Sequence, residues 1–317
     1  MNDGLSPHDP TPPASPVLIG YALMAFLGAV VTAVLLKLDG RILAGEPLWL
    51  KPTKFFLSSA IAAATVEWVI RKSGLGSRRL DACRAVIAFG FLIEMVIICG
   101  QAARGVRSHF NHSTPVDTGL FAIMGTVIIG VVIAIGVAGF TATGAASRWA
   151  RAERTVLRWG IAVFVAAAFL GYSMGRPTPA QQRQTDADGR PRILGSHFVG
   201  SEEGTTRIWP LTGWSLESGD LRVPHFVGMH AIQAMVLLAF LVKRLGVPMD
   251  DDGSVRQMAV VGMLFGGVWL LTLVQAFSGH SFLHPGVFQV GLWVALGVLA
   301  GTILSMILGR RRKGVAA

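Results

Sequence analysis

Residues 82–103 read ACRAVIAFGFLIEMVIICGQAA, a run of 22 residues in which only Arg84 and Glu94 carry charge. A helix of about 20 apolar residues can cross the hydrocarbon core of a bilayer, and it satisfies its own backbone hydrogen bonds there. The whole chain shares this character, because 52% of its 317 residues are hydrophobic and only 15% are charged. The sequence therefore predicts an all-α integral membrane protein.

Eight apolar segments of this kind follow one another along the chain. They are Val17–Leu36, Phe55–Ile70, Ala82–Ala103, Gly119–Gly139, Leu157–Met174, His225–Val242, Met258–Ser278 and Gly286–Leu308. We expect a polytopic bundle of about eight transmembrane helices, forming a single domain over residues 17–309. Residues 1–16 are polar and rich in proline and are expected to be a disordered tail, and residues 310–317 form a short basic tail.

Lysine and arginine predict the orientation of these helices. The loops after the second, fourth and sixth segments, the adjoining helix ends and the C-terminal tail together carry 16 of the 28 basic residues. Cytoplasmic loops carry this excess, so we expect a plasma (inner) membrane protein with both termini in the cytoplasm. Lys37 and Arg41 argue locally for the opposite insertion. The net charge of +10 fits anchoring on anionic membrane lipid and predicts no nucleic-acid partner.

Seven of the eight histidines fall at the ends of segments that this orientation places outside the cell. They are His109, His112, His197, His225, His230, His280 and His284. The one long outer loop, residues 175–224, is a possible lid over these helix ends. This one-sided arrangement predicts a polar site at the outer (periplasmic or extracellular) face.

The third segment carries the candidate catalytic residues Glu94, Gln101 and Arg104. At 100° per residue they form one polar stripe, together with Ser108, that climbs to the outer surface. Glu94 lies near the middle of the bilayer, where an ionised carboxylate costs at least a few kcal/mol unless it is paired or protonated. The structural alternative is a neutral Glu94 that is hydrogen-bonded to a neighbouring helix.

The remaining candidates are imidazole, amide and basic side chains at the same end of the bundle. The predicted metal ligands are His109, His112, His225, His230, His280 and His284. The predicted cofactor contacts are His230, His109, Arg107, Lys51, Lys54, Gln233, Gln275 and Gln289. Structural roles stay open, because glutamines join membrane helices by hydrogen bonds and lysines reach out to lipid headgroups.

Three functions are compatible with this pattern. The first is a membrane oxidoreductase with haem b or a transition metal, exchanging electrons with a quinone or a redox partner. The second is a metal-dependent enzyme that acts on a lipid or small molecule at the outer face. The third is a small-anion transporter coupled to a proton on Glu94, which inverted repeats or broken helices in the membrane would favour, although the sequence shows little of either. The sequence identifies neither the substrate nor the oligomeric state.

Overall fold

The computed structural model describes residues 14–183, 192–201, 206–209 and 212–315, and its regular structure is almost entirely helical. Its elements are α1 (Pro16–Leu38), β1 (Ile42–Leu43), β2 (Glu46–Pro47), α2 (Leu50–Ser73), α3 (Arg78–Ala103), α4 (Pro115–Ala142), α5 (Arg151–Leu170), η1 (Gly171–Gly175), α6 (Pro179–Arg183), β3 (Phe198–Val199), β4 (Gly219–Asp220), α7 (Arg222–Met229), α8 (Ala231–Arg244), α9 (Asp252–Phe277) and α10 (Val287–Val315). The two short antiparallel pairs are β1 with β2 and β3 with β4. The predicted all-α class is confirmed. The predicted tail lies, up to residue 13, outside the described residues.

Within the described ranges, six helices are long and apolar enough to cross a membrane. They are α1, α2, α3, α4, α5 continued to Gly175, and α9. The pair α7 and α8 would make a seventh span, bent by 46°. The last predicted segment forms α10, whose described apolar part is Val287–Thr302. The chain is therefore a multi-pass helical membrane protein.

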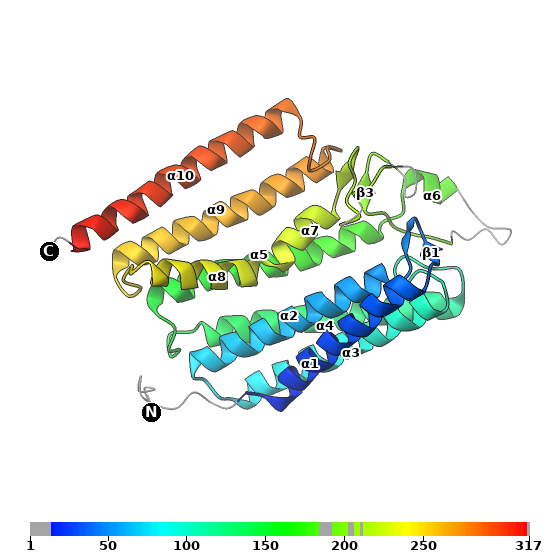
Figure 1. Ribbon diagram of the computed structural model, residues 1–317, viewed down its shortest axis with the longest axis horizontal. Helices are drawn as coiled ribbons and strands as arrows, with labels where there is room; N and C mark the ends of the chain where they lie inside the picture. Colours follow the sequence, from blue (N-terminus) through cyan, green and yellow to red (C-terminus); the bar gives the residue numbers. More distant parts are fainter. Residues whose placement is uncertain (1–13, 184–191, 202–205, 210–211, 316–317) are drawn as a thin grey trace. The chain divides into compact units, whose positions relative to one another are not determined.

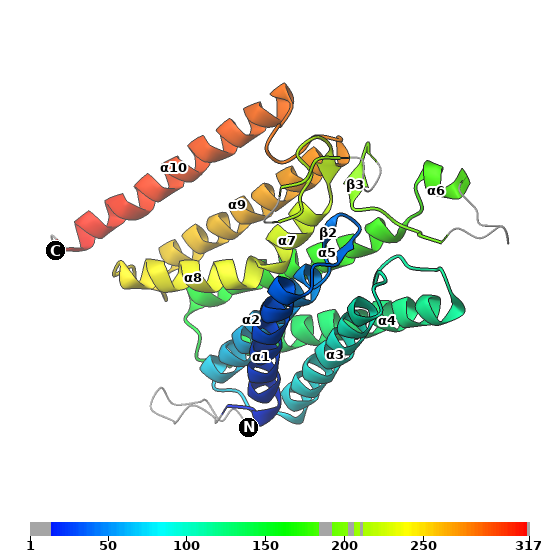
Figure 2. The ribbon, with the colours of Figure 1, turned by 45° about the vertical axis from the view of Figure 1, so that its right-hand side comes forward.

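The helices group into two compact units, which are described separately. Unit 1 comprises residues 1–142 and 172–196, and unit 2 comprises residues 143–171 and 197–317. In unit 1, α1 packs along α2, and α3 packs against α4 and α2 (Figure 1). In unit 2, α5 contacts α7, α8 and α9, while α10 lies along α9 (Figure 2).

Capping residues mark several of the helix ends. Ser77 accepts a hydrogen bond from the backbone N–H of Leu80 at the start of α3, and Asp251 does the same for Ser254 in α9. Gly74 ends α2 in the left-handed conformation, with φ 72°.

The bend between α7 and α8 falls at His230, the single residue between the two helices. No proline lies at the break, and packing explains the geometry better. A Cβ on Gly228 would lie 2.1 Å from Cβ of Ala167, so α7 approaches α5 as closely as the backbones allow. The indole N–H of Trp269 also donates to the carbonyl of Pro224. The sequence predicted one uninterrupted helix over His225–Val242, and the structure divides it in two.

Candidate functional site

The first polar site of unit 1 joins the start of α2 to the turn that follows α3. Nζ of Lys51 lies 3.0 Å from Nδ1 of His109, and the hydroxyl of Ser108 lies 3.1 Å from the same nitrogen. An ammonium group only donates, so Nδ1 accepts and the proton of the neutral imidazole is on Nε2. This contact places the positive charge of Lys51 at Nδ1, and the N–H of His109 on Nε2 points away from Lys51.

Aromatic rings surround this pair. The ring centroids of Phe55, Phe121 and Phe110 lie 5.8, 6.0 and 6.2 Å from that of His109. We call Lys51, Phe55, Ser108, His109, Phe110 and Phe121 the His109 cluster. His112 adjoins it, with its ring 5.6 Å from that of Phe121, and burial lowers the pKa of His112 below its usual range.

The backbone of the cluster is strained at Phe110, which has a φ of 61°. A bulky residue rarely adopts this conformation, and strain of this kind persists only where the surroundings hold it in place. The backbone N–H of Leu194 donates to the carbonyl of Phe110, and Ile193 forms a bridge with Asn111. A Cβ on Gly195 would lie 2.5 Å from the Phe110 ring. The residues after α6, Ile193 to Gly195, therefore hold the turn that contains Phe110 in this conformation.

Glu94 lies deeper in the same unit and is 6% exposed. Its Oε1 has no hydrogen-bond partner among the described residues. Lys51, Tyr21 and Tyr172 are all close enough to interact with it electrostatically. The hydroxyl of Tyr21 donates instead to Ser59 at 2.8 Å. The environment of Glu94 thus contains one nearby cation and no hydrogen bond that satisfies Oε1.

Gln101 and Arg104 belong to a separate network that fastens α3 to α4. Asp117, which is 2% exposed, accepts hydrogen bonds from Nε2 of Gln101 and from Nη1 of Arg104, both at 2.8 Å. Thr114 caps α4 and also donates to Asp117. Asp117 is not among the site residues predicted from the sequence. Its position three residues after Thr114, as in a capping box, was the available signal.

The other two candidates of unit 1 lie beside these groups. The carbonyl of Arg107 accepts a hydrogen bond from the side chain of Asn111 at 3.1 Å, and both belong to the same turn as His109. Lys54 is half-buried and follows Lys51 by about one turn of α2. Eight of the predicted site residues therefore lie in unit 1: Lys51, Lys54, Glu94, Gln101, Arg104, Arg107, His109 and His112.

In unit 2, His225 lies within α7, and His230 follows the last residue of that helix. Nδ1 of His225 donates to the carbonyl of Ala167 at 2.7 Å, which leaves the lone pair on Nε2. His197 and His230 both lie within electrostatic range of His225. His230 packs on Phe226, with ring centroids 4.4 Å apart.

The candidate glutamines of unit 2 differ in their surroundings. Gln275 is 1% exposed, donates to the carbonyls of Ser281 and Phe282, and accepts from the indole of Trp293. It therefore ties α9 to α10. Gln233 has an Oε1 without a hydrogen-bond partner in the described part of the chain.

The last two candidate histidines lie in the turn before α10. Oε1 of Gln289 and Nε2 of His280 both approach Gly286, lying 2.5 and 2.8 Å from the place where a Cβ would be. Nδ1 of His284 lies 2.9 Å from the carbonyl of Leu216 and donates to it. This last contact connects the turn to the long loop before α7.

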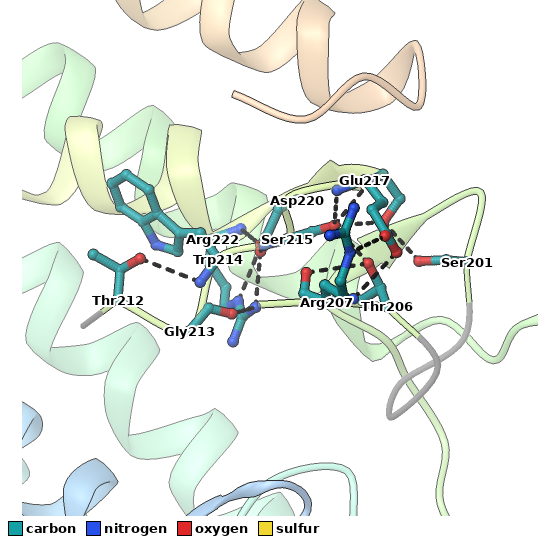
Figure 3. A network of polar contacts seen from close by, with 11 residues as sticks. Ser201, Thr206, Arg207, Thr212, Gly213, Trp214, Ser215, Glu217, Asp220 and Arg222 are labelled. Atoms are coloured by element: carbon teal, nitrogen blue, oxygen red, sulfur yellow. Dashed lines mark hydrogen bonds and ion pairs between the residues drawn. The ribbon is translucent and has the colours of Figure 1, made fainter. Parts of the chain in front are cut away.

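The described part of that loop contains a polar network of its own (Figure 3). Asp220, which is 1% exposed, accepts hydrogen bonds from Arg222 and from the backbone N–H of Ser215. Arg207 pairs with Glu217 at the exposed edge. The predicted lid stays a prediction, since residues 184–191, 202–205 and 210–211 lie outside the described ranges.

Within the described ranges, no group of three or more His, Cys, Asp or Glu side chains is arranged to hold a metal ion. The six histidines predicted as ligands thus provide no such three-ligand group. Cys83 and Cys99, the two cysteines, are both free. Comparisons with family models, curated proteins and solved structures found no match.

Proposed function

We propose that this chain is a carrier that moves a small anion across the membrane together with a proton. In this proposal Glu94 binds the proton, and Lys51 with His109 binds the anion at the outer face. The observation that carries it is the buried Oε1 of Glu94, which has no hydrogen-bond partner among the described residues. A structural carboxylate in such a position is expected to be paired or fully hydrogen-bonded.

The depth of Glu94 supports a role inside the membrane. It lies nine residues before the end of α3, and at 1.5 Å per residue this is about 14 Å below the turn that carries His109. An ionised carboxylate at that depth costs at least a few kcal/mol. The protonated form avoids this cost, so Glu94 is suited to carry a proton through the bilayer.

Lys51 provides the coupling between the two ligands. Its positive charge attracts the ionised form of Glu94, and an anion bound at Lys51 would offset that attraction. Anion binding therefore favours proton binding at Glu94, and the reverse holds to the same extent because coupling free energies are reciprocal. The two ligands would cross as a pair without net charge.

The bent pair α7 and α8 is a second feature that a carrier would use. Helices interrupted within the membrane are common in transporters, where they help to form binding sites and permit movement. His230 occupies the break and Gln233 follows it by one turn, with the unpartnered amide oxygen described above. Neither a redox protein nor a scaffold requires this interruption.

Proteoliposomes that contain a pH-sensitive dye test the proposal. Chloride, phosphate, sulfate and benzenesulfonate are added outside in turn, since none of them crosses lipid readily in a neutral form. We expect at least one to acidify the lumen with the wild-type chain, and Glu94→Gln to abolish the proton signal. Glu217→Gln makes the same chemical change at an exposed residue and should leave the signal intact. Equal signals from wild type and Glu94→Gln, or none from any anion, would refute the proposal.

A second candidate, a haem-containing redox protein, is favoured by His225 alone. A histidine that donates its Nδ1–H to a backbone carbonyl has the tautomer of a metal ligand, with Nε2 facing the metal. A haem needs only one or two axial ligands, so the lack of a three-ligand group does not bear on it. Absorption spectra of the oxidised and dithionite-reduced protein, with His225→Ala beside wild type, test this candidate. A Soret band lost in the variant would support it, and a colourless wild-type protein would refute it.

A further inference from the structure

The break between α7 and α8 carries two polar side chains on one face of the chain. His230 forms the break, and Gln233 follows it by three residues, which is about one helical turn. Oε1 of Gln233 is buried and has no hydrogen-bond partner in any described segment. The ring of His230 does not cap α8, so the start of that helix does not use the hydrogen-bonding capacity of the ring.

Aromatic and apolar surface continues this face in both directions. Phe226 is 50% exposed, and its ring centroid lies 4.4 Å from that of His230 and 5.8 Å from that of Trp214. On the other side of the polar pair, Leu237 follows Gln233 by four residues and is 57% exposed. We call Phe226, His230, Gln233 and Leu237 the break face. A ligand bound there would have its polar group beside the two polar side chains and apolar surface on either side.

The charges of the two helices lie far from this face. The charged side chains of α7 and α8, both of which are fully described, are Arg222, Lys243 and Arg244. Arg222 lies about two turns before His230 and pairs with the buried Asp220, and the other two lie more than three turns after the break. An unpaired charge inside a membrane is costly, so the break face is suited to an uncharged ligand.

The neighbouring helices α5 and α9, also described in full, add no charge at this level. A Cβ on Gly160 would lie 2.9 Å from the carbonyl oxygen of Ala231, so Gly160 faces α8. Arg158 lies two residues earlier, about 200° around α5, and is therefore on the side away from α8. On α9, Trp269 contacts α7, and the nearest charged residue of that helix, Arg256, is more than three turns away.

The unpartnered oxygen of Gln233 indicates which group an uncharged ligand must supply. An amide oxygen only accepts, so the ligand has to carry an O–H or an N–H. A hydroxyl group both donates and accepts, and it is therefore matched to the amide oxygen of Gln233 and the ring N–H of His230 at the same time. An aromatic ring beside that hydroxyl gains from edge-to-face packing on Phe226, which an alkyl chain lacks.

From these observations we infer that the break face binds a neutral, lipid-soluble phenol or quinol. Its hydroxyl donates to Oε1 of Gln233 and accepts from the ring N–H of His230. Its ring packs on Phe226, and its apolar substituent lies along Leu237. The inference goes beyond the proposed carrier and uses neither the group proposed to bind the proton nor the groups proposed to bind the anion.

Equilibrium binding of tritiated 4-hexylphenol to the full chain in lipid nanodiscs tests the inference. Empty nanodiscs measure partition into the lipid, which is subtracted. Three unlabelled competitors each lack one feature: 4-hexylanisole lacks the hydroxyl hydrogen, 1-decanol lacks the ring, and 4-hexylbenzoate carries a charge. We expect each of them to bind about fivefold more weakly than 4-hexylphenol or worse, which is the effect of losing one ordinary hydrogen bond or one aromatic contact.

Two pairs of variants locate the binding. Gln233→Leu should weaken the binding of 4-hexylphenol by about fivefold and should not weaken that of 4-hexylanisole, which has no hydrogen to donate. Gln257→Leu makes the same change at a half-buried glutamine of α9 and should alter neither. Phe226→Leu should also weaken the binding of 4-hexylphenol. Its control is Phe277→Leu, at a phenylalanine that is 52% exposed and ends α9.

Equal affinities for 4-hexylphenol and 4-hexylanisole, unchanged binding in Gln233→Leu, or no binding above that of empty nanodiscs would overturn the inference. If Gln233→Leu fails to fold, photolabelling of the wild-type chain with a diazirine derivative of 4-hexylphenol replaces it. We expect the label on α7 and α8 and its loss in excess 4-hexylphenol. A label found only elsewhere, or one that 4-hexylphenol does not displace, would overturn the inference.

The outcome is separable from that of the proposed carrier. Binding of 4-hexylphenol without proton movement in liposomes supports the break face as a binding site and counts against the carrier. Proton movement that depends on Glu94, without any binding of 4-hexylphenol, supports the carrier and overturns this inference.

Discussion

Two glutamates are buried in the described part of unit 1, Glu67 and Glu94, and they should respond very differently to the same substitution. Glu67 is 1% exposed and Glu94 is 6% exposed, so both are removed from solvent. Changing each in turn to glutamine conserves shape and removes the possibility of negative charge. We predict that Glu67→Gln strongly destabilises the unit and that Glu94→Gln does not.

The contacts of Glu67 determine the size of the first effect. Its carboxylate accepts hydrogen bonds from Nε of Arg84 at 2.8 Å and from the backbone N–H of Ser15 at 2.7 Å. Arg84 is also buried, with 8% of its side chain exposed. Removing one partner of a buried pair costs about 3–5 kcal/mol. Asp81 still contacts Arg84 at 2.9 Å, so we expect about 3 kcal/mol, the lower end of that range.

The surroundings of Glu94 predict a much smaller effect. Its Oε1 has no hydrogen-bond partner in the described part of the chain, so no bond to that atom is lost. If the folded protein holds Glu94 in its neutral form, the substitution exchanges one neutral polar group for another. The change in the free energy of unfolding should then be about 1 kcal/mol or less, the scale of one ordinary hydrogen bond.

The two cysteines of the chain provide the assay. Cys83 and Cys99 both lie on α3, with Cys83 buried and Cys99 half-buried, so a thiol-reactive fluorophore reports the exposure of this helix directly. The midpoint of SDS-induced unfolding is measured for wild type and both variants. A loss of stability in Glu94→Gln as large as that in Glu67→Gln would show that Glu94 is ionised and structurally paired. That result would remove the basis of the proposed proton site.

Three further predictions concern the loops. Gly219→Ala should destabilise the packing of the segment before α7 by about 1–3 kcal/mol, because the new Cβ would lie 1.9 Å from the carbonyl oxygen of Ala276. Faster proteolysis of that segment than in wild type, with Gly291→Ala as the control, measures this loss. Asp220→Asn should cost about 3 kcal/mol, because it removes the buried carboxylate that pairs with Arg222 while the contact of Arg222 with the carbonyl of Gly213 remains; unchanged resistance to trypsin at Arg222 would contradict this. The depressed pKa of His112 means that unfolding takes up a proton, so stability should fall as the pH drops below about 6.5, and His112→Gln should make the unfolding midpoint less dependent on pH.

Composition and spacing were enough to predict the helices of the bundle. The segment quoted first, Ala82–Ala103, lies within α3 (Arg78–Ala103), and Met258–Ser278 corresponds to α9 (Asp252–Phe277). The observed helices extend further at their polar ends because caps such as Ser77 and Asp251 lie outside the apolar run. Apolar content reports the part of a helix that meets lipid or core, whereas hydrogen bonding determines where the helix begins.

The bend at His230 was beyond the reach of sequence reasoning, because its causes come from other helices. Gly228 is compatible with a straight helix, and the close contacts with Ala167 on α5 and Trp269 on α9 show why it must be glycine. Residues that favour a kink by themselves, proline above all, are absent from the break. A pattern along one segment contains no information about the partner that bends it.

The sequence predicted which residues gather at one end of the helices. It did not predict which of these residues contact each other. Lys51 and His109 were both named, but their contact depends on the turn after α3, where the strain at Phe110 has no local signature. Glu94 was recognised from its charge alone. The carboxyl group that organises Gln101 and Arg104, Asp117, resembled an ordinary helix-capping residue.

Lys51 connects the two halves of the proposed mechanism, and its position explains why they would operate together. It touches His109 directly and also interacts electrostatically with Glu94, so one charge serves both the anion and the proton. Two independent sites would each have to take a charged ligand out of water at full cost. With a shared lysine, the bound anion neutralises the cation while the proton neutralises the carboxylate, and the loaded protein carries no unpaired charge at the site. A charge crosses the membrane at the lowest cost when an opposite charge compensates it. The carrier therefore has a physical reason to move the anion and the proton together and to release neither of them alone.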